Sequence, residues 1–316
     1  MADVIKTATR DAYGKALVEL GQKNDKVIVF DADLAAATKT GMFKKEFPER
    51  FIDCGIAEGN MMGVAAGMAT AGYTVFASSF AMFAAGRAFE QVRNSIGYPH
   101  LNVKIGATHA GITVGEDGAT HQCNEDIALM RTIPGMTIVN PSDAVEARAA
   151  VEAALTTNGP FYLRFGRFAV PVINDNPDYK FELGKGICVA DGKDVTIVAT
   201  GLMVSMALEA KELLAEEGID ARIINIHTIK PIDKDILAKA AEETGALVTA
   251  EEHNVIGGLG AAVTEAICER CPVPVIRVGM NDTYGHSGTV PALLEAYGLT
   301  PVKIAEAAKK AISLKK

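Results

Sequence analysis

Short runs of β-branched and other apolar residues alternate along the chain with longer segments rich in Ala and Glu. This alternation is typical of βα units, in which crossover helices join parallel strands. In the first half the pattern predicts five strands: Val27–Asp31, Tyr73–Ser78, Val103–Thr108, Thr137–Asn140 and Phe161–Arg164. It also predicts four helices: Thr7–Gly21, Gly59–Ala71, Phe83–Gly97 and Ser142–Thr157, the last with Ser142 as its N-terminal cap.

The alternation is interrupted once, by turn-forming residues and two prolines between Pro171 and Asp178. It then resumes with strands at Val195–Thr200, Ala221–Ile226, Ala246–Thr249 and Val273–Val278, and with helices that end at Glu217, span Asp233–Thr244, begin at Gly260 and close the chain. We therefore predict an α/β protein of two successive doubly wound domains, each on a largely parallel sheet. They cover residues 1–170 and 185–316, with a linker at 171–184.

Composition narrows the function classes. The 316 residues and the 49% hydrophobic content suit two ordinary cores, and the net charge of −8 argues against a general nucleic-acid binder. An anionic substrate would need a local patch of Arg and His. The first residues lack the apolar core of a signal peptide, and no apolar run is long enough to span a bilayer. We expect a cytoplasmic protein without membrane contact.

Five cysteines are too few and too scattered for a disulfide scaffold. Cys268 and Cys271 form a CxxC pair, but no second pair and no pair of histidines completes a zinc site. The sequence therefore favours neither a metal site nor a redox role for them.

The segment Asp53–Met62 places Glu58 where a strand ends and a helix begins. Glu58 could simply complement the positive end of the helix dipole. It could also act on a ligand, because open α/β sheets bind ligands at the carboxyl ends of their strands.

A second polar segment follows the strand that ends at Thr108. It contains His109, Asp117 and His121 among three glycines. A metal site is not favoured, since no matching ligand cluster completes it. A solvated loop and a loop that displays catalytic groups both remain open.

Three further features carry possible chemistry. Arg10, Arg164 and Arg167 stand at segment ends, and two or three of them converging with His109 would make a phosphate clamp. Phe80 and Phe83 are either core residues or a stacking platform. The polar stretch from Glu251 to Gly260 is either a structural turn or an anion-binding nest.

Taken together, these segments resemble the C-terminal half of transketolase, and in particular the smaller subunit of a transketolase split into two chains. The resemblance covers the pyrimidine-binding and C-terminal domains. It rests on GIAEGNM (55–61), THAGITVGEDGATHQ (108–122) and PSDAVEAR (141–148).

The resemblance implies roles for individual residues. Glu58 would activate thiamine diphosphate as a protonated carboxyl in a dry site, and Phe83, or else Phe80, would stack on the pyrimidine ring. His121 would be catalytic, with Asp117 at the reacting oxygens of the sugar. Arg10, His109 and Arg167 would contact the sugar phosphate.

Two departures qualify this assignment. Ala37 stands where the family has a serine for the same phosphate, so Thr38 or Lys39 would have to replace it. The GDG motif with a downstream Asn, through which these enzymes hold diphosphate by Mg²⁺, is also absent from the sequence. We therefore expect Mg²⁺ or Ca²⁺ to be held mainly by an N-terminal partner subunit.

The leading hypothesis is thus one subunit of a heterotetrameric transketolase of the pentose phosphate pathway, which acts on sugar phosphates and also self-associates through the same domains. The alternatives are the beta subunit of a 2-oxoacid dehydrogenase, half of a split 1-deoxyxylulose-5-phosphate synthase, and a non-catalytic assembly module. The intact Glu58, Asp117 and His121 speak against the last.

Overall fold

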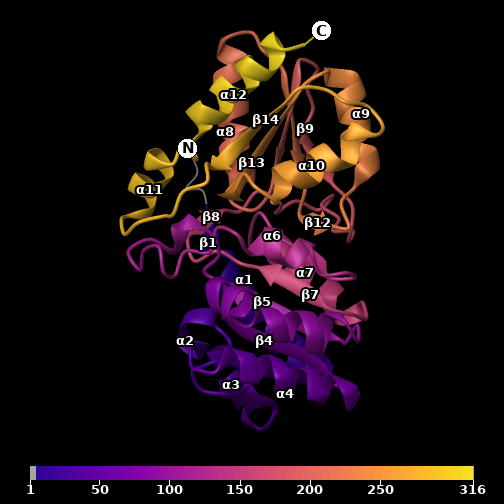
Figure 1. Cartoon of the computed structure of the whole chain (residues 1–316), viewed down its shortest axis with the longest axis vertical. Coiled ribbons are helices and arrows are strands. Elements are labelled where there is room, and N and C mark those ends of the chain that lie inside the picture. The colour runs from indigo at the N-terminus through magenta and orange to yellow at the C-terminus, as the bar shows by residue number, and fades with distance from the viewer. Residues whose placement is uncertain (1–4, 316) are drawn as a thin grey trace.

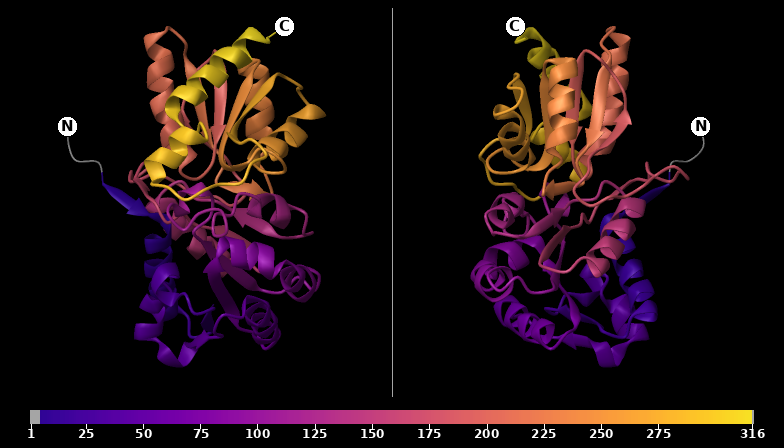
Figure 2. Two further views of the ribbon diagram at one scale, coloured as in Figure 1. Left: turned by 60° about the vertical axis from the view of Figure 1, so that its left-hand side comes forward. Right: turned by 90° about the vertical axis from the view of Figure 1, so that its right-hand side faces the viewer.

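The computed structural model describes residues 5–315, which form two α/β domains stacked end to end (Figures 1 and 2). The first domain is the indigo-to-magenta part of Figure 1 and the second is the orange-to-yellow part. Each is built on its own mostly parallel sheet, so the predicted fold class is confirmed.

The first sheet has seven strands in the order β12-β6-β7-β5-β4-β2-β3. Six of them pair in parallel: β2 (Val27–Asp31), β3 (Phe51–Asp53), β4 (Thr74–Phe80), β5 (Val103–Thr108), β6 (Thr137–Val139) and β7 (Phe161–Arg164). The seventh, β12 (Thr228–Lys230), comes from the second half of the chain and runs antiparallel to β6. The second domain therefore completes an edge of the first sheet.

Helices cover both faces of this sheet. The helices of the first domain are α1 (Thr9–Lys23), α2 (Ala35–Thr38), α3 (Gly41–Glu46), α4 (Glu58–Thr70), α5 (Phe89–Gln91), α6 (Asp126–Arg131) and α7 (Ala144–Thr156). One core cluster joins α1, α3 and α7, and another joins α4 and α6. The single helix predicted at Phe83–Gly97 is wrong in type: it consists of two π-helical segments, η2 (Met82–Arg87) and η3 (Val92–Gly97), on either side of α5.

The predicted cap of α7 is wrong by one residue. Asp143, not Ser142, accepts the amide of Glu146 with its side chain, at 2.9 Å. The Glu146 carboxylate reaches back to the Ser142 amide at 2.6 Å, which makes a capping box shifted by one position. Asp143 also accepts the amides of Ile173 and Asn174, so it ties the helix to the segment that leaves the first domain.

The second sheet has the order β14-β13-β10-β11-β9. Its strands are β9 (Ile187–Ala190), which is antiparallel to β11, and the parallel β10 (Val195–Ala199), β11 (Ala221–Asn225), β13 (Leu247–Asn254) and β14 (Val275–Met280). Its helices are α8 (Met203–Glu216), α9 (Lys234–Thr244), α10 (Leu259–Cys268), α11 (Val290–Ala296) and α12 (Pro301–Ser313). Helices α8 and α12 pack together on the sheet, as do α9 and α10.

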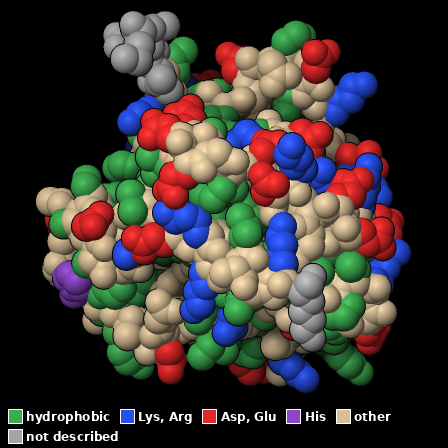
Figure 3. Space-filling view, turned by 90° about the horizontal axis from the view of Figure 1, so that it is seen from above, with side chains coloured by type: hydrophobic (Ala, Val, Ile, Leu, Met, Phe, Trp, Pro, Cys, Tyr) green, Lys and Arg blue, Asp and Glu red, His purple; other side chains and the backbone are tan. Residues whose placement is uncertain are grey.

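Two short strands lie beside the junction of the domains. β1 (Lys6–Ala8) pairs antiparallel with β8 (Ala169–Pro171). Between β8 and β9 the chain forms no helix or strand. The face seen in Figure 3 carries acidic and basic side chains intermixed. Within residues 5–315, no helix has the length and apolarity needed to cross a membrane.

Replacement of Asp143 by Ala should destabilise the chain by about 3 kcal/mol, because one helix cap and two further amide contacts are lost from a buried position. Thr300→Ala is the matched control. Thr300 caps α12 through a single exposed contact to the Lys303 amide. Thermal melting should show the larger decrease in Tm for Asp143→Ala. A larger decrease for Thr300→Ala would contradict the assignment.

Candidate active site

The predicted site residues follow the carboxyl ends of neighbouring strands in the first sheet. Glu58 follows β3, Phe83 follows β4, His109 follows β5 and Arg167 follows β7. Because these strands are parallel, their carboxyl ends meet at one edge of the sheet, where ligands bind in open α/β folds. The topology thus brings together residues that are more than 100 positions apart.

Glu58 begins α4 and is only 2% exposed. Its two carboxylate oxygens lie 3.1 and 3.0 Å from Nη1 of Arg87, a side chain that is half exposed. The Arg87 guanidinium also lies over the Phe83 ring, 4.6 Å from its centroid. The expected burial of Glu58 is therefore present, and the ion pair with Arg87 is a contact that the sequence did not suggest.

Glu58, Phe83 and His121 line one pocket of about 530 Å³, together with Ala32, Asp33, Leu34, Ile56, Arg87 and Thr120. Phe80 is placed differently. It is buried and its ring stacks on the imidazole of His109, with 3.8 Å between the ring centroids. Of the two aromatic candidates, Phe83 lines the pocket beside Glu58, and Phe80 supports His109.

His109 is buried, and both of its ring nitrogens have partners. Nδ1 lies 2.9 Å from Oγ1 of Thr108, and Nε2 lies 2.8 Å from Nη1 of Arg10. Burial, reinforced by Arg10 and by further nearby cations, lowers the pKa of His109 to about 3. The imidazole is therefore neutral near pH 7. Because Arg10 can only donate, Nε2 is the acceptor and Nδ1 carries the proton.

Basic side chains gather around His109. Arg10 also donates to the carbonyl of Ala37 at 3.1 Å, and burial lowers its pKa. Arg167 donates to the carbonyl of Val114. Arg164 is not part of this group, contrary to the suggested clamp: it is buried and makes two contacts with Asp126, at 2.8 and 3.2 Å.

The segment around Ala37 offers one replacement for the missing serine. Thr38 is buried, and its hydroxyl donates to Asp31 at 2.7 Å, so it does not face a ligand. Lys39 forms a partly exposed ion pair with Asp11 at 3.3 Å. Of the two candidates, Lys39 is the side chain that remains accessible.

The loop that carries Asp117 and His121 places only His121 in the pocket beside Glu58, and Asp117 does not line it. Asp117 is exposed, and His121 is half-buried, with Nδ1 2.9 Å from Oγ1 of Thr120. The edge of the His121 ring meets the Phe83 ring, with 5.4 Å between centroids. His121 therefore stands closer to the Glu58 pocket than His109 does.

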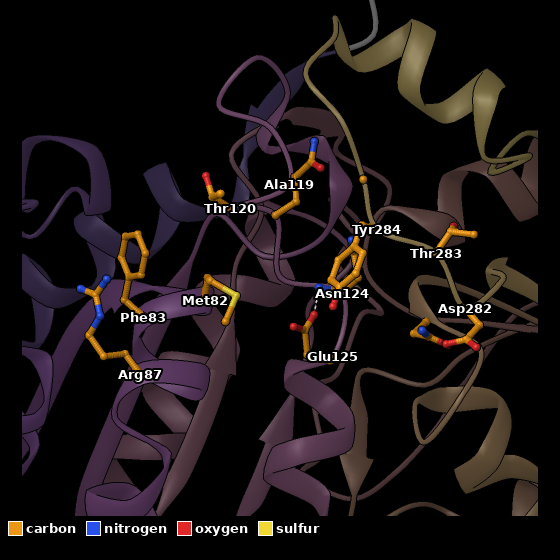
Figure 4. Close-up of a pocket in the computed structure, with 13 residues that line it drawn as sticks. Met82, Phe83, Arg87, Ala119, Thr120, Asn124, Glu125, Asp282, Thr283 and Tyr284 are labelled. Carbon is orange, nitrogen blue, oxygen red and sulfur yellow. Dashed lines mark hydrogen bonds between the residues drawn. The ribbon is translucent and has the colours of Figure 1, made fainter.

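A larger pocket of about 860 Å³ adjoins this one and opens between the two domains (Figure 4). Phe83 and Arg87 lie on one side, and Tyr284 and Asp282 from the second domain lie on the other. The sequence did not indicate Arg87 or this second-domain wall. Arg87 lies in a segment predicted to be an ordinary helix, and the 280–288 segment carries no motif.

The stretch from Glu251 to Gly260 is a structural feature, not an anion nest. Glu251 lies in β13, and its carboxylate accepts the amides of Leu259 and Gly260 at the start of α10, at 2.5 and 2.8 Å. The strand continues past the predicted end at Thr249, so Glu251 occupies the position that a bound anion would take.

The described residues, 5–315, contain no group of three or more His, Cys, Asp or Glu side chains that could hold a metal ion. Cys268 and Cys271 are free thiols.

Family models match almost the whole chain. The transketolase pyrimidine-binding domain matches residues 5–172, and the transketolase C-terminal domain matches residues 184–304. The chain belongs to the transketolase family. This family depends on thiamine diphosphate.

Three similar proteins narrow the comparison within the transketolases. A transketolase C-terminal section from Methanocaldococcus jannaschii is 50% identical over 94% of this chain and 94% of its own length. A 6-deoxy-6-sulfo-D-fructose transketolase subunit from Clostridium sp. (strain MSTE9) is 46% identical over 95% of this chain and 92% of that protein. A solved structure described as a split gene transketolase, inactive beta4 tetramer, is 55% identical with a TM-score of 0.90, covering 98% of this chain and 99% of that one.

His109 should remain unprotonated well below neutral pH. The unfolded chain takes up its proton near pH 6.5 and the folded chain only near pH 3, so this histidine destabilises the fold progressively as the pH falls between those values. Burial also lowers the pKa of His227 and His253 to about 4, so ring ¹⁵N spectra should show three histidines that do not titrate between pH 8 and pH 5, and the signal missing in His109→Gln should be one of these. A midpoint for that signal between pH 5 and pH 8 would contradict the buried, cation-flanked placement.

Proposed function

We propose that this chain is the C-terminal subunit of a thiamine-diphosphate-dependent transketolase, which transfers a two-carbon ketol unit from a ketose phosphate to an aldose phosphate. It would act with an N-terminal partner chain. The observation that carries the proposal is the buried carboxyl of Glu58, which shares a pocket with Phe83 and His121 at the carboxyl edge of the first sheet.

The pocket residues fit the aminopyrimidine half of the cofactor. A buried carboxyl can hold a proton at a ring nitrogen, and an aromatic face beside it can stack on a flat heterocycle. When bound, thiamine diphosphate supplies the electron sink for breaking a carbon–carbon bond. The ion pair of Glu58 with Arg87 has to open first, because the guanidinium, 3.0 Å away, occupies the side of the carboxyl that a ring nitrogen would contact.

The sugar would be handled by the other residues at this edge. His121 is the group we assign to proton transfer at the reacting oxygens, with Asp117 on the same loop as a hydrogen-bond partner. Arg10 and Arg167 would bind the terminal phosphate as cations. His109, being neutral, would contribute a hydrogen bond and no charge.

Among the described residues no three His, Cys, Asp or Glu side chains form a group that could hold a metal, and the sequence lacks the GDG motif with a downstream Asn. We therefore assign Mg²⁺ or Ca²⁺ to the partner. The names of the similar proteins, a C-terminal section and a split-gene transketolase, support this division. The description of one of them as an inactive tetramer supports self-association without activity. A heterotetramer in the cytoplasm, working in the pentose phosphate pathway, completes the proposal.

Glu58→Gln should slow deprotonation at C2 of the bound cofactor by about 10²- to 10⁴-fold in the complex with the partner, because the amide keeps the shape but cannot relay the proton. Hydrogen–deuterium exchange at C2, at matched cofactor occupancy, is the measurement.

The control for that experiment is Glu90→Gln, which changes an exposed carboxylate on the neighbouring α5. It should leave the exchange rate unchanged. The wild-type chain without the partner should show neither tight cofactor binding nor turnover. An unchanged rate for Glu58→Gln would remove the reason for calling this chain catalytic, and turnover by the chain alone would disprove the split architecture.

Arg10→Ala and Arg167→Ala should raise KM for phosphorylated sugars by about 30- to 150-fold, the equivalent of about 2–3 kcal/mol for one charge-assisted phosphate contact. Unphosphorylated substrates should be used almost as well as by the wild type. Steady-state kinetics of the complex on both substrate classes decides the matter, with the exposed Arg93→Ala as the control. Equal losses on both classes would mean that these arginines are structural.

A further inference from the structure

The second domain holds the loop that carries the proposed sugar-binding residues. We call residues 109–122 the substrate loop. The carboxylate of Glu252, in β13 of the second domain, accepts the backbone amide of Thr113 at 2.7 Å. Both residues are buried. A buried amide loses a contact that water cannot replace when its acceptor is removed, so this contact fixes the loop.

The backbone of the loop is shaped to receive this carboxylate. Gly111 has a φ of +79°, and a Cβ built there would lie 2.3 Å from Oε1 of Glu252. No other residue type fits this position without moving the carboxylate. Glu252 and the substrate loop are therefore packed against each other as complementary surfaces.

Glu252 is itself held rigidly. Its backbone carbonyl accepts Nη2 of Arg164 at 2.9 Å, and Arg164 is locked by its two contacts with Asp126. Asp126 also accepts the hydroxyl of Tyr162 at 2.8 Å. All of these groups are buried, so the position of Glu252 is set by β7 and α6 of the first domain as well as by its own strand.

Other residues of the substrate loop also contact the second domain. Ile112 is part of the second-domain core cluster. Nε2 of Gln122 donates to the carbonyl of His286 at 2.9 Å. Gly118 leaves room for Ser287, whose hydroxyl would lie 2.5 Å from an added Cβ. The second domain therefore contacts the substrate loop at several points along its length. Glu252 makes the one contact among these in which a carboxylate accepts a backbone amide of the loop.

We propose that Glu252 is a positioning residue for sugar binding: it fixes the substrate loop so that His121 lines the pocket beside Glu58 and Asp117 is held four residues before it. The role of the loop rests on the proposed function. With this contact the second domain helps to position the active-site loop, in addition to packing against the first domain.

The chain offers a matched control in the adjacent residue. Glu251 is also buried in β13, and it too accepts backbone amides, but those amides belong to α10 and not to the substrate loop. Burial raises the pKa of both carboxyls to about 7. Substitution at either position therefore removes a buried carboxylate that accepts backbone amides. At Glu252 the amide belongs to the substrate loop, and at Glu251 the amides belong to α10.

The test has two measurements. The first is amide hydrogen exchange of the 109–122 peptides in the chain alone, for Glu252→Ala, Glu252→Gln and Glu251→Ala. The second is kinetics of the complex reconstituted with the N-terminal subunit, on a ketose phosphate donor. For Glu252→Ala we expect exchange in the loop and KM for the sugar each to rise about tenfold, the effect of one lost hydrogen bond. Cofactor affinity should change far less than sugar affinity, because Glu58 and Phe83 lie outside the loop and only Thr120 and His121 of the loop line their pocket.

Glu252→Gln should restore most of both properties, since its amide oxygen can still accept the Thr113 amide. Glu251→Ala should leave loop exchange at the wild-type value. If Glu252→Ala does not fold, Glu252→Asp, which is one methylene shorter, takes its place. Wild-type exchange and KM in Glu252→Ala, equal loop exchange in Glu251→Ala, or no rescue by Gln would each overturn the proposal. A wild-type complex without transferase activity would overturn the proposed function, while the exchange data would still decide what holds the loop.

Discussion

The ion pair between Asp126 and Arg164 is the contact on which the junction of the domains depends. Both side chains are almost fully buried, and their distances of 2.8 and 3.2 Å are those of a two-pronged carboxylate–guanidinium pair. Arg164 holds the pKa of Asp126 below its usual range, and Asp126 raises that of Arg164, so both remain charged. Loss of one partner would strand the other charge in the interior, at a cost of about 3–5 kcal/mol.

This pair joins elements that the sequence keeps far apart. Arg164 ends β7, Asp126 begins α6, and Arg164 also reaches the carbonyl of Glu252 in β13. Glu252 in turn accepts the Thr113 amide, so the Asp126–Arg164 pair also restrains the position of Thr113. Arg164, which the sequence suggested for phosphate binding, therefore has a structural role: it holds Asp126 and the backbone of Glu252. Arg10 and Arg167 are then the arginines left near His109, on a chain whose net charge is −8.

Much of the fold followed from the sequence, because β-branched runs mark buried parallel strands. Strands such as β2 and β5 lie where the pattern placed them, and parallel pairing explains why residues after different strands meet at one edge. The sequence did not reveal β12, because its three residues pair across the domain junction and carry no periodic signal. The polar residues 251–253 looked like a turn, yet they lie in β13, where the side chain of each has a hydrogen-bond partner.

The same reasoning explains what was missed at the site. A π-helical segment has the composition of an ordinary helix, but its wider turn moves side chains out of the 3.6-residue period. Within this segment Arg87 lies over Phe83 and against Glu58, while its side chain stays half exposed.

The Arg87 contact also fits a site that this chain completes only in part. Ile56, on the rim of the Glu58 pocket, is 77% exposed, and Tyr284, on the rim of the larger pocket, is 88% exposed. Large apolar side chains around a functional cleft gain stability when another surface covers them. In the single chain, Arg87 gives the buried carboxylate of Glu58 the charged partner it needs. A ligand that displaced Arg87 would therefore have to bring a group that hydrogen-bonds to Glu58, and a surface beside that group that covers the ring of Phe83. The burial of Glu58 thus makes the pocket selective, because a ligand without such a group would leave the carboxylate without a partner.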